Sequence, residues 1–338
     1  MTVIELKFGW RLFGVVILAC CILVAFIAVT WPQEHANKAL TPKMVNAVLA
    51  HELTDSQAKL LSNNGFAVEA DVDFDPASNW TVIYDLSKKY NLTLIGKIDY
   101  LTVKDNFTLE DWNQTVQQAV SDYGDIVHIW EIWNEPIYPT NFKGYFNGSA
   151  STYTDLLKVA YQIIHSSNSG ATVIGFGGLQ LYSSVDPKPF NTWVLQGLKF
   201  AKNVTALDGM NYCDAIGLHA YPWGANYTNS IQNQFISAVN NFRQITGKDI
   251  WITETGQTSG EYSRNQTDKA DYLNQTYTLF HNLDVKGYVW YELNDDRGRV
   301  EKEGSFGLFD LNGKATEAFN TYLEVAKSFM KLTTSAHL

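Results

Sequence analysis

The chain has 338 residues, of which 46% are hydrophobic and 14% aromatic, a composition that supports a packed core and excludes an intrinsically disordered protein. Its formal net charge of −10, without a basic cluster, argues against nucleic acid as a partner. The length fits two average domains or one large α/β barrel, which commonly runs to about 250 residues.

The N-terminal segment differs from the rest of the chain. Residues 12–31, "LFGVVILACCILVAFIAVTW", carry no charge, and roughly 20 apolar residues are what a helix needs to cross a bilayer. Lys7 and Arg11 precede this run, and positive charge on that side keeps residues 1–11 in the cytoplasm. We therefore predict a transmembrane signal anchor at 12–31, then a linker at 32–41 and an extracellular body. A cleaved signal peptide, which would make the protein secreted, is the alternative.

Acceptor motifs for N-glycosylation, Asn-x-Ser/Thr, independently favour export of the chain. They occur at Asn79, Asn91, Asn106, Asn113, Asn147, Asn203, Asn226, Asn265 and Asn274. Cys20 and Cys21 lie in the apolar segment, so Cys213 is the only cysteine of the body and an intradomain disulfide is excluded. We predict a cell-surface glycoprotein whose stability depends on packing.

Strand-like and helix-like segments then alternate to the end of the chain. The expected strands are 44–50, 66–74, 92–101, 125–135, 171–179, 214–221, 249–255 and 286–293. The expected helices between and after them are 53–64, 80–90, 109–122, 153–166, 190–206, 230–245, 267–283 and 315–331. Eight such units predict a closed (β/α)8 TIM barrel over residues 42–332. An open parallel sheet is the alternative, because the segment 44–50 is the weakest strand.

Active sites of such barrels lie at the C-terminal ends of the strands, so polar residues that close a strand are the candidates. The fourth strand ends in Asn134 and Glu135, the sixth in His219 and Tyr221, and the seventh in Glu254. Two glutamates at the C-terminal ends of the fourth and seventh strands, on opposite sides of one barrel, suit glycoside hydrolysis. In that reaction one carboxylic acid protonates the leaving oxygen and a carboxylate faces it.

Other strand-end residues fit the recognition of a sugar. Tyr221, Trp223 and Trp290 are aromatic side chains that suit the apolar faces of sugar rings, while Asn134 and His219 suit hydrogen bonds to hydroxyl groups.

Three motifs together resemble the clan A retaining glycoside hydrolases of the family 5 and family 39 type. They are "WNEP" at 133–136, "HAYPW" at 219–223 and "TETG" at 253–256. The resemblance covers roughly residues 42–332 and includes "FGLFDLNGKATEAFNTY" at 306–322.

The resemblance implies Glu135 as the acid/base and Glu254 as the nucleophile of a retaining reaction, with carboxyl groups about 5–5.5 Å apart. It also implies that Asn134 holds the 2-hydroxyl of the sugar and that Tyr221 donates a hydrogen bond to the nucleophile. The resemblance further implies that His219 lines the sugar subsite and that Trp290 forms the floor of this subsite. It also implies that neither a metal nor an organic cofactor takes part.

The sequence also departs from the family pattern. Cellulase-like family 5 members carry an arginine near the end of the second strand, whereas 66–74 reads "FAVEADVDF". Asp71, Lys97 and Asp99 are the nearby polar residues, and we expect Lys97 and Asp99 to bind substrate. Glu131 shares the strand parity of Glu135 and is expected to be a buried structural carboxylate.

We therefore expect a monomeric extracellular β-glycosidase that binds an oligo- or polysaccharide and is held at the membrane through residues 12–31. A transglycosylase with the same residues differs only in the acceptor. An inert carbohydrate-binding surface protein is the alternative outside the enzymes, and the presence of both glutamates argues against it.

Overall fold

The computed structural model describes residues 44–181, 192–222, 227–260, 264–298 and 304–335. The predicted anchor at 12–31, the linker at 32–41, and Trp223 lie outside these ranges. Within them, no helix is long and apolar enough to cross a membrane.

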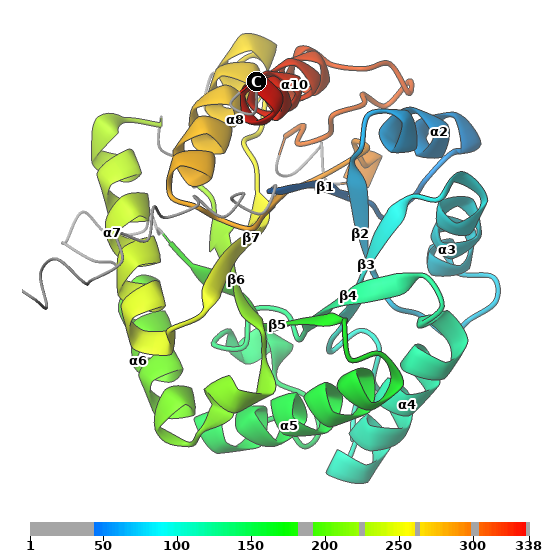
Figure 1. The fold of residues 1–338 in the computed structure, drawn as a ribbon, viewed down its shortest axis with the longest axis vertical. Helices are drawn as coiled ribbons and strands as arrows, with labels where there is room; N and C mark the ends of the chain where they lie inside the picture. The colour runs from blue at the N-terminus through cyan, green and yellow to red at the C-terminus, as the bar shows by residue number, and fades with distance from the viewer. Residues whose placement is uncertain (1–43, 182–191, 223–226, 261–263, 299–303, 336–338) are drawn as a thin grey trace, which may run out of the picture. The chain divides into compact units, whose positions relative to one another are not determined.

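Eight parallel strands form a closed barrel in chain order, as predicted (Figure 1). They are β1 (Val45–Leu49), β2 (Ala67–Asp71), β3 (Thr93–Ile98), β4 (Val127–Ile132), β5 (Thr172–Gln180), β6 (Ala215–Ala220), β7 (Asp249–Thr255) and β8 (Gly287–Trp290). The weak segment 44–50 does form a strand, and its pairing with β8 closes the barrel. This closure overturns the open-sheet alternative.

Helices surround the strands on the outside of the barrel (Figure 1). They are α2 (Asp55–Asn63), α3 (Asn79–Tyr90), α4 (Leu109–Tyr123), α5 (Ala150–Ser167), α6 (Thr192–Ala206), α7 (Asn229–Thr246), α8 (Gln266–Asn282) and α10 (Glu317–Ser335), with 3-10 turns at Pro139–Asn141 and Gly209–Tyr212. Local sequence fixes several starts: Thr54, Thr108 and Asn265 each form a reciprocal capping box with the residue three positions later. The predicted alternation of strands and helices is thereby confirmed.

Both apolar and charged side chains are buried on the strands of the barrel. One small cluster of buried side chains comes from the strands themselves: Ala47, Leu49, Ala67, Ile95, Ile174, Ala215, Trp251 and Val289. Buried charged residues also lie on the strands: Glu69 on β2, Lys97 on β3 and Glu131 on β4. Because buried charges are costly unless they are paired, these residues point to a site rather than to packing.

Helix α10 is tied to the seam where β8 meets β1. The hydroxyl of Tyr322 lies 2.9 Å from the carbonyl oxygen of Tyr288 on β8 and 3.1 Å from that of Ala47 on β1. Tyr322 is fully buried, so its hydroxyl has no access to water as a substitute partner.

We predict that Tyr322→Phe lowers the free energy of unfolding by about 1–2 kcal/mol, because a buried hydrogen bond is lost at the seam. The matched control is Tyr84→Phe, which removes a surface hydrogen bond of 2.7 Å to Asp125 and is expected to cost about 0.5 kcal/mol or less. Urea unfolding measures both, and equal effects of the two changes would contradict the prediction.

Candidate active site

Strand register brings one row of polar side chains together at the ends of β5, β6 and β7. Gln180 pairs in register with His219, and His219 pairs with Glu254. The three residues are 1%, 1% and 9% exposed. Side chains at one level of neighbouring parallel strands face the same side, so this row forms one buried polar group.

The loop after β4 aims Glu135 at this row. Trp133 and Glu135 have φ angles of 72° and 46°, which ordinary residues adopt only at a cost of about 1–3 kcal/mol each. The amide of Glu135 donates a 2.7 Å hydrogen bond to the carbonyl of Gly177. Gly177 has to be glycine, because a Cβ atom there would lie 1.8 Å from the carbonyl oxygen of Trp133. The surrounding backbone thus holds a strained conformation that places the Glu135 side chain.

The Glu135 carboxylate contacts two members of the row. Its Oε1 atom accepts a 2.7 Å hydrogen bond from Nε2 of Gln180 and lies 3.0 Å from Nδ1 of His219. Gln180 was not predicted as a site residue. Its position as the last residue of a strand is the signal that could have identified it.

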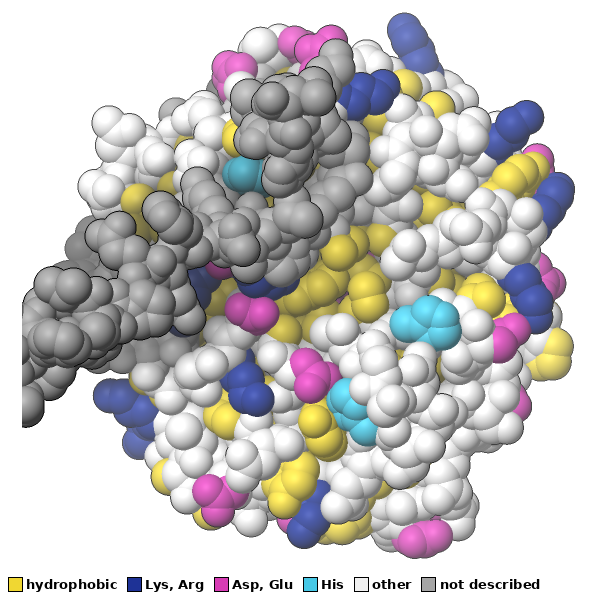
Figure 2. Space-filling view, viewed as in Figure 1, with side chains coloured by type: hydrophobic (Ala, Val, Ile, Leu, Met, Phe, Trp, Pro, Cys, Tyr) yellow, Lys and Arg dark blue, Asp and Glu magenta, His cyan; other side chains and the backbone are white. Residues whose placement is uncertain are grey.

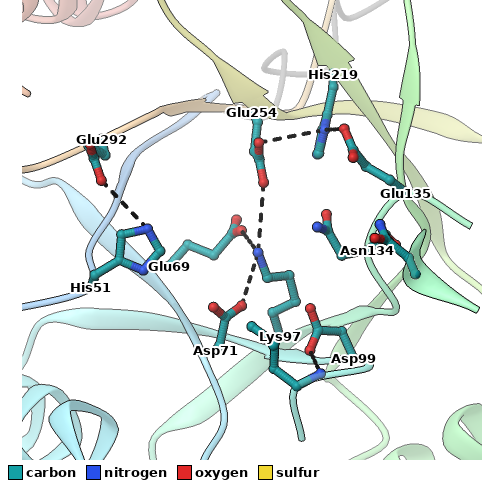
Figure 3. A network of polar contacts seen from close by, with 12 residues as sticks. His51, Glu69, Asp71, Lys97, Asp99, Asn134, Glu135, His219, Glu254 and Glu292 are labelled. Carbon is teal, nitrogen blue, oxygen red and sulfur yellow. Dashed lines mark hydrogen bonds and ion pairs between the residues drawn. The ribbon is translucent and has the colours of Figure 1, made fainter. Parts of the chain in front are cut away.

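The Glu254 carboxylate has different partners on its two oxygens. Oε2 accepts a 2.8 Å hydrogen bond from the hydroxyl of Tyr221 and lies 3.6 Å from Nδ1 of His219. Oε1 lies 3.7 Å from Nζ of Lys97. Figure 3 shows His219 between Glu254 and Glu135, in contact with both. Burial opposes a charge on His219, but the negative charge of Glu254 and the hydrogen bond to Glu135 raise its pKa.

A second row lies on the neighbouring strands, where Asp71, Lys97 and Glu131 are register partners across β2, β3 and β4. Nζ of Lys97 lies 3.0 Å from Asp71 and 3.9 Å from Glu69, which precedes Asp71 by two positions and faces the same side. Burial opposes a charge on Lys97, but Asp71, Glu254 and Glu69 together raise its pKa well above the ordinary value.

Glu254 from the first row and Asp71 from the second reach a cavity of about 330 Å³, and Glu135 also lines it. It is lined by Leu49, His51, Asp71, Lys97, Asp99, Tyr100, Leu101, Asn134, Glu135, Tyr138, Tyr221, Glu254, Tyr291 and Phe306. The structure thus brings six predicted site residues to one cavity: Asn134, Glu135, Tyr221, Glu254, Lys97 and Asp99. Sequence reasoning missed His51, Tyr138 and Tyr291, which come from loops after the strands.

Two predicted residues lie behind the cavity wall. His219 is 1% exposed and reaches the cavity only through its contacts with Glu135 and Glu254. Trp290 is fully buried, packs with the apolar core and donates a 3.1 Å hydrogen bond to the carbonyl of Phe306. The expectation that Trp290 forms the floor is therefore corrected: Tyr291, the next residue along the chain, lines the cavity instead.

The chemical groups at the cavity include carboxyl groups, a lysine and tyrosines. Across the described ranges, no group of three or more His, Cys, Asp or Glu side chains could hold a metal ion. Two carboxylates with separate hydrogen-bond partners face one cavity, and such a pair can protonate one atom of a ligand while attacking another.

Comparison with protein families gives one match: residues 105–322 match the family described as "Glycosyl hydrolase catalytic core". No curated protein sequence matches the chain.

Several solved structures are similar to this chain. A family 39 glycoside hydrolase from the gut symbiont Bacteroides cellulosilyticus WH2 is 20% identical with a TM-score of 0.58, over 85% of this chain and 64% of its own. The exo-β-1,4-mannosidase from Opitutaceae bacterium strain TAV5 is 12% identical with a TM-score of 0.61, over 86% and 60%. A GH128 endo-β-1,3-glucanase from Pseudomonas viridiflava is 17% identical with a TM-score of 0.54, over 82% and 96%. The chain spans less than two thirds of the first two enzymes, and at these identities the likeness shows the barrel fold.

We predict that Asp99→Asn makes the protein more stable near neutral pH. Burial, followed by the negative charge of Asp71, raises the pKa of Asp99 from 3.8 to about 7. A carboxyl with a raised folded-state pKa contributes stability below its unfolded pKa and loses it as the pH rises through the folded value. Between pH 4 and 7, the free energy of unfolding of the wild type should therefore fall relative to the variant, by up to about 4 kcal/mol.

Denaturant unfolding of both proteins at several pH values measures this difference. Asp122→Asn, which changes an exposed carboxylate, is the control and should follow the wild-type pH curve. Parallel curves for wild type and Asp99→Asn would show that Asp99 is not protonated in the folded state.

Proposed function

The chain belongs to the glycosyl hydrolase catalytic core family and is a glycoside hydrolase, and from this premise we propose that it cleaves β-glycosidic bonds with retention of configuration. The observation that carries the proposal is the approach of Glu135 and Glu254 to one nitrogen of His219, at 3.0 and 3.6 Å. Glu135 follows β4 and Glu254 lies on β7, and both carboxylates line one cavity.

Their closeness supports retention rather than inversion. Retaining enzymes hold the two carboxyl groups about 5–5.5 Å apart, whereas inverting enzymes need roughly 6.5–9.5 Å to admit a water molecule between carboxylate and sugar. Two oxygens that share contact with a single nitrogen suit the shorter spacing.

The surroundings of each carboxylate support the assignment of roles. Glu254 accepts the Tyr221 hydroxyl and faces the ammonium group of Lys97, two interactions that favour an ionised nucleophile. Glu135 is held by Gln180 and His219 at the mouth of the barrel, where a leaving oxygen would lie.

The reaction then runs in two steps. Glu135 gives its proton to the glycosidic oxygen as the bond from that oxygen to the anomeric carbon breaks, and Glu254 forms an ester bond to the same carbon. In the second step Glu135 takes a proton from water, the water oxygen attacks the anomeric carbon, and the bond to Glu254 breaks. Both glutamates return to their starting protonation states.

The charges around the cavity favour an uncharged sugar. Asp71 and Glu254 line it beside the single ammonium group of Lys97, and the protonated carboxyl groups of Asp99 and Glu135 add no positive charge. A uronic acid or a sulfated sugar would bring further negative charge to this site, which like-charge repulsion disfavours. We propose a neutral β-linked polysaccharide or glycan as the substrate, with Asn134, Tyr221 and Asp99 around the sugar and His219 behind the two glutamates.

The binding region extends past one cavity. A neighbouring cavity of about 430 Å³ shares His51, Asp71 and Leu101 with the first. Leu101 is 63% exposed at this boundary and offers an apolar surface for a sugar ring. This continuity supports an oligosaccharide rather than a single sugar as the bound species.

We also propose that the enzyme works outside the cell, held by the predicted anchor at 12–31. Acceptor asparagines at 79, 91, 106, 147, 203, 265 and 274 are exposed, and Asn113 is half-buried, so a transferase could reach them in the folded protein. Figure 2 shows acidic and basic side chains scattered singly over the described part of one face, which supports a solvent-facing surface without a nucleic-acid site.

We predict that the full chain, expressed in a eukaryotic host, stays in the membrane fraction and loses mass on treatment with an N-glycosidase. Mass spectrometry of the N-terminal peptides separates an anchor, which keeps residues 12–31, from a cleaved signal peptide. Recovery of unglycosylated protein in the cytosol would refute the location.

We predict that Glu254→Gln lowers turnover of an aryl β-glycoside by roughly 10⁴-fold or more, because the covalent step loses its nucleophile. Glu135→Gln is expected to cost about 10²–10⁴-fold on a polysaccharide, where the leaving group needs a proton. The loss from Glu135→Gln should be much smaller on aryl glycosides whose leaving group departs without a proton. A screen of β-mannan, β-1,3-glucan, xylan and aryl β-glycosides with the wild type identifies the substrates for these turnover measurements.

Glu110→Gln, which changes an exposed glutamate, is the matched control and should keep wild-type activity. Proton NMR of the first-formed product tests retention directly, and an added acceptor sugar shows whether transfer competes with hydrolysis. Equal losses for the Glu135 and Glu254 variants on an activated aryl glycoside would overturn the division of roles.

A further inference from the structure

The carboxylates beneath the cavity outnumber the ammonium group that pairs with them. Lys97 forms ion pairs with Asp71, Glu254 and Glu69, at 3.0, 3.7 and 3.9 Å (Figure 3). Its side chain is 4% exposed, so water screens these interactions very little. One positive charge does not balance three carboxylates, and two of them, Glu69 and Glu254, are buried, which favours the protonated form of the deepest one.

Glu69 is the carboxyl that best fits the protonated state. It is fully buried at the centre of β2, with Lys97 as a distant partner at 3.9 Å. Burial, followed by the negative charge of neighbouring Glu131, raises its pKa well above the ordinary value. An uncharged Glu69 does not attract the ammonium group of Lys97 as a carboxylate would.

Asp71 and Glu254 are the two other carboxylates beside Lys97, at 3.0 and 3.7 Å. The Asp71 side chain is 21% exposed and thus partly hydrated, whereas that of Glu254 is 11% exposed. Glu254 therefore depends more on the protein for compensation of its charge. Tyr221 supplies a hydrogen bond to Oε2, and Lys97 is the cation that faces Oε1.

We propose that Lys97 is a positioning residue that holds Glu254 ionised and orients its Oε1 oxygen, while Glu69, the most distant of its partners at 3.9 Å, does not compete for the ammonium group. This inference rests on the proposed role of Glu254 as nucleophile. It replaces the expected substrate-binding role of Lys97 with one that acts through the nucleophile.

The groups that face Lys97 and Glu254 define the pH behaviour. They are Glu69 and Asp71 from β2, Asp99 after β3, Glu131 from β4, Glu135 after β4, and His219 and Tyr221 from β6 and its end. Lys97→Met removes one positive charge and leaves all of these in place. The acid limb of kcat/KM reports ionisation of the nucleophile in the free enzyme.

We expect Lys97→Met to move this acid limb to higher pH, because the ionised carboxylate loses the positive charge that lies 3.7 Å from its Oε1 atom. The loss of kcat/KM should consequently be largest at low pH and shrink as the pH rises. A substitution that merely disturbed packing would lower activity at every pH and leave the limb in place.

Glu69→Gln is the matched test, since glutamine has the shape of a protonated glutamate. We expect it to fold and to leave the acid limb where the wild type has it. A limb that shifts in Glu69→Gln would mean that Glu69 is charged and competes for Lys97, which overturns the proposal even if Lys97→Met fails to fold. An unmoved limb in folded Lys97→Met, checked by circular dichroism, would also overturn it.

These outcomes are separate from failure of the proposed function. If the wild type cleaves no glycoside, or if Glu254→Gln keeps full activity, the proposed function is wrong. If the wild type is active and Glu254→Gln is not, but the limb stays in place in Lys97→Met, the proposed function survives and the role of Lys97 is wrong.

Discussion

The structure depends on holding two carboxylates, Glu135 and Glu254, in contact with the same imidazole nitrogen of His219. The two carboxylates repel each other whenever both are ionised, and a poorly hydrated interior strengthens that repulsion. His219, whose pKa is raised by both glutamates, compensates part of this charge, and hydrogen bonds from Gln180 and Tyr221 compensate more.

The closed barrel provides the geometry that this contact requires. Parallel register places Gln180, His219 and Glu254 at one level. Glu135 comes from a loop, and the positive φ angles at Trp133 and Glu135 turn that loop so that its carboxylate reaches the same level. The glycines after Phe176 leave space for the turned backbone. A Cβ atom on Gly178 would lie 2.1 Å from the His219 ring, so this position also fixes where the imidazole can sit. Local strain at the catalytic loop is therefore balanced by close packing on the neighbouring strand.

Strand-helix alternation was enough to predict the barrel, and strand-end position was enough to find Glu135, Glu254, Asn134 and Tyr221. The Trp290 prediction failed because side chains alternate across a strand. Val289 belongs to the small cluster of strand residues, so Trp290 points the other way, into the larger apolar core, and Tyr291 faces the cavity. The contacts of Gln180 and Lys97 were hidden for another reason, because they depend on pairing between strands rather than on spacing along one.

Buried acids in this barrel fall into two groups with different effects on the site. Glu131, whose pKa is raised by burial, lies at the level of Lys97 but in the closed interior, and Glu69 lies one step deeper on its own strand. A protonated Glu69 is a neutral hydrogen-bonding group, so it fills the interior without adding to the charge that Glu135 and Glu254 experience. Depth in the barrel thus separates Glu69 and Glu131, whose pKa values burial raises, from Asp71, Glu135 and Glu254, which line the cavity where the proposed chemistry takes place.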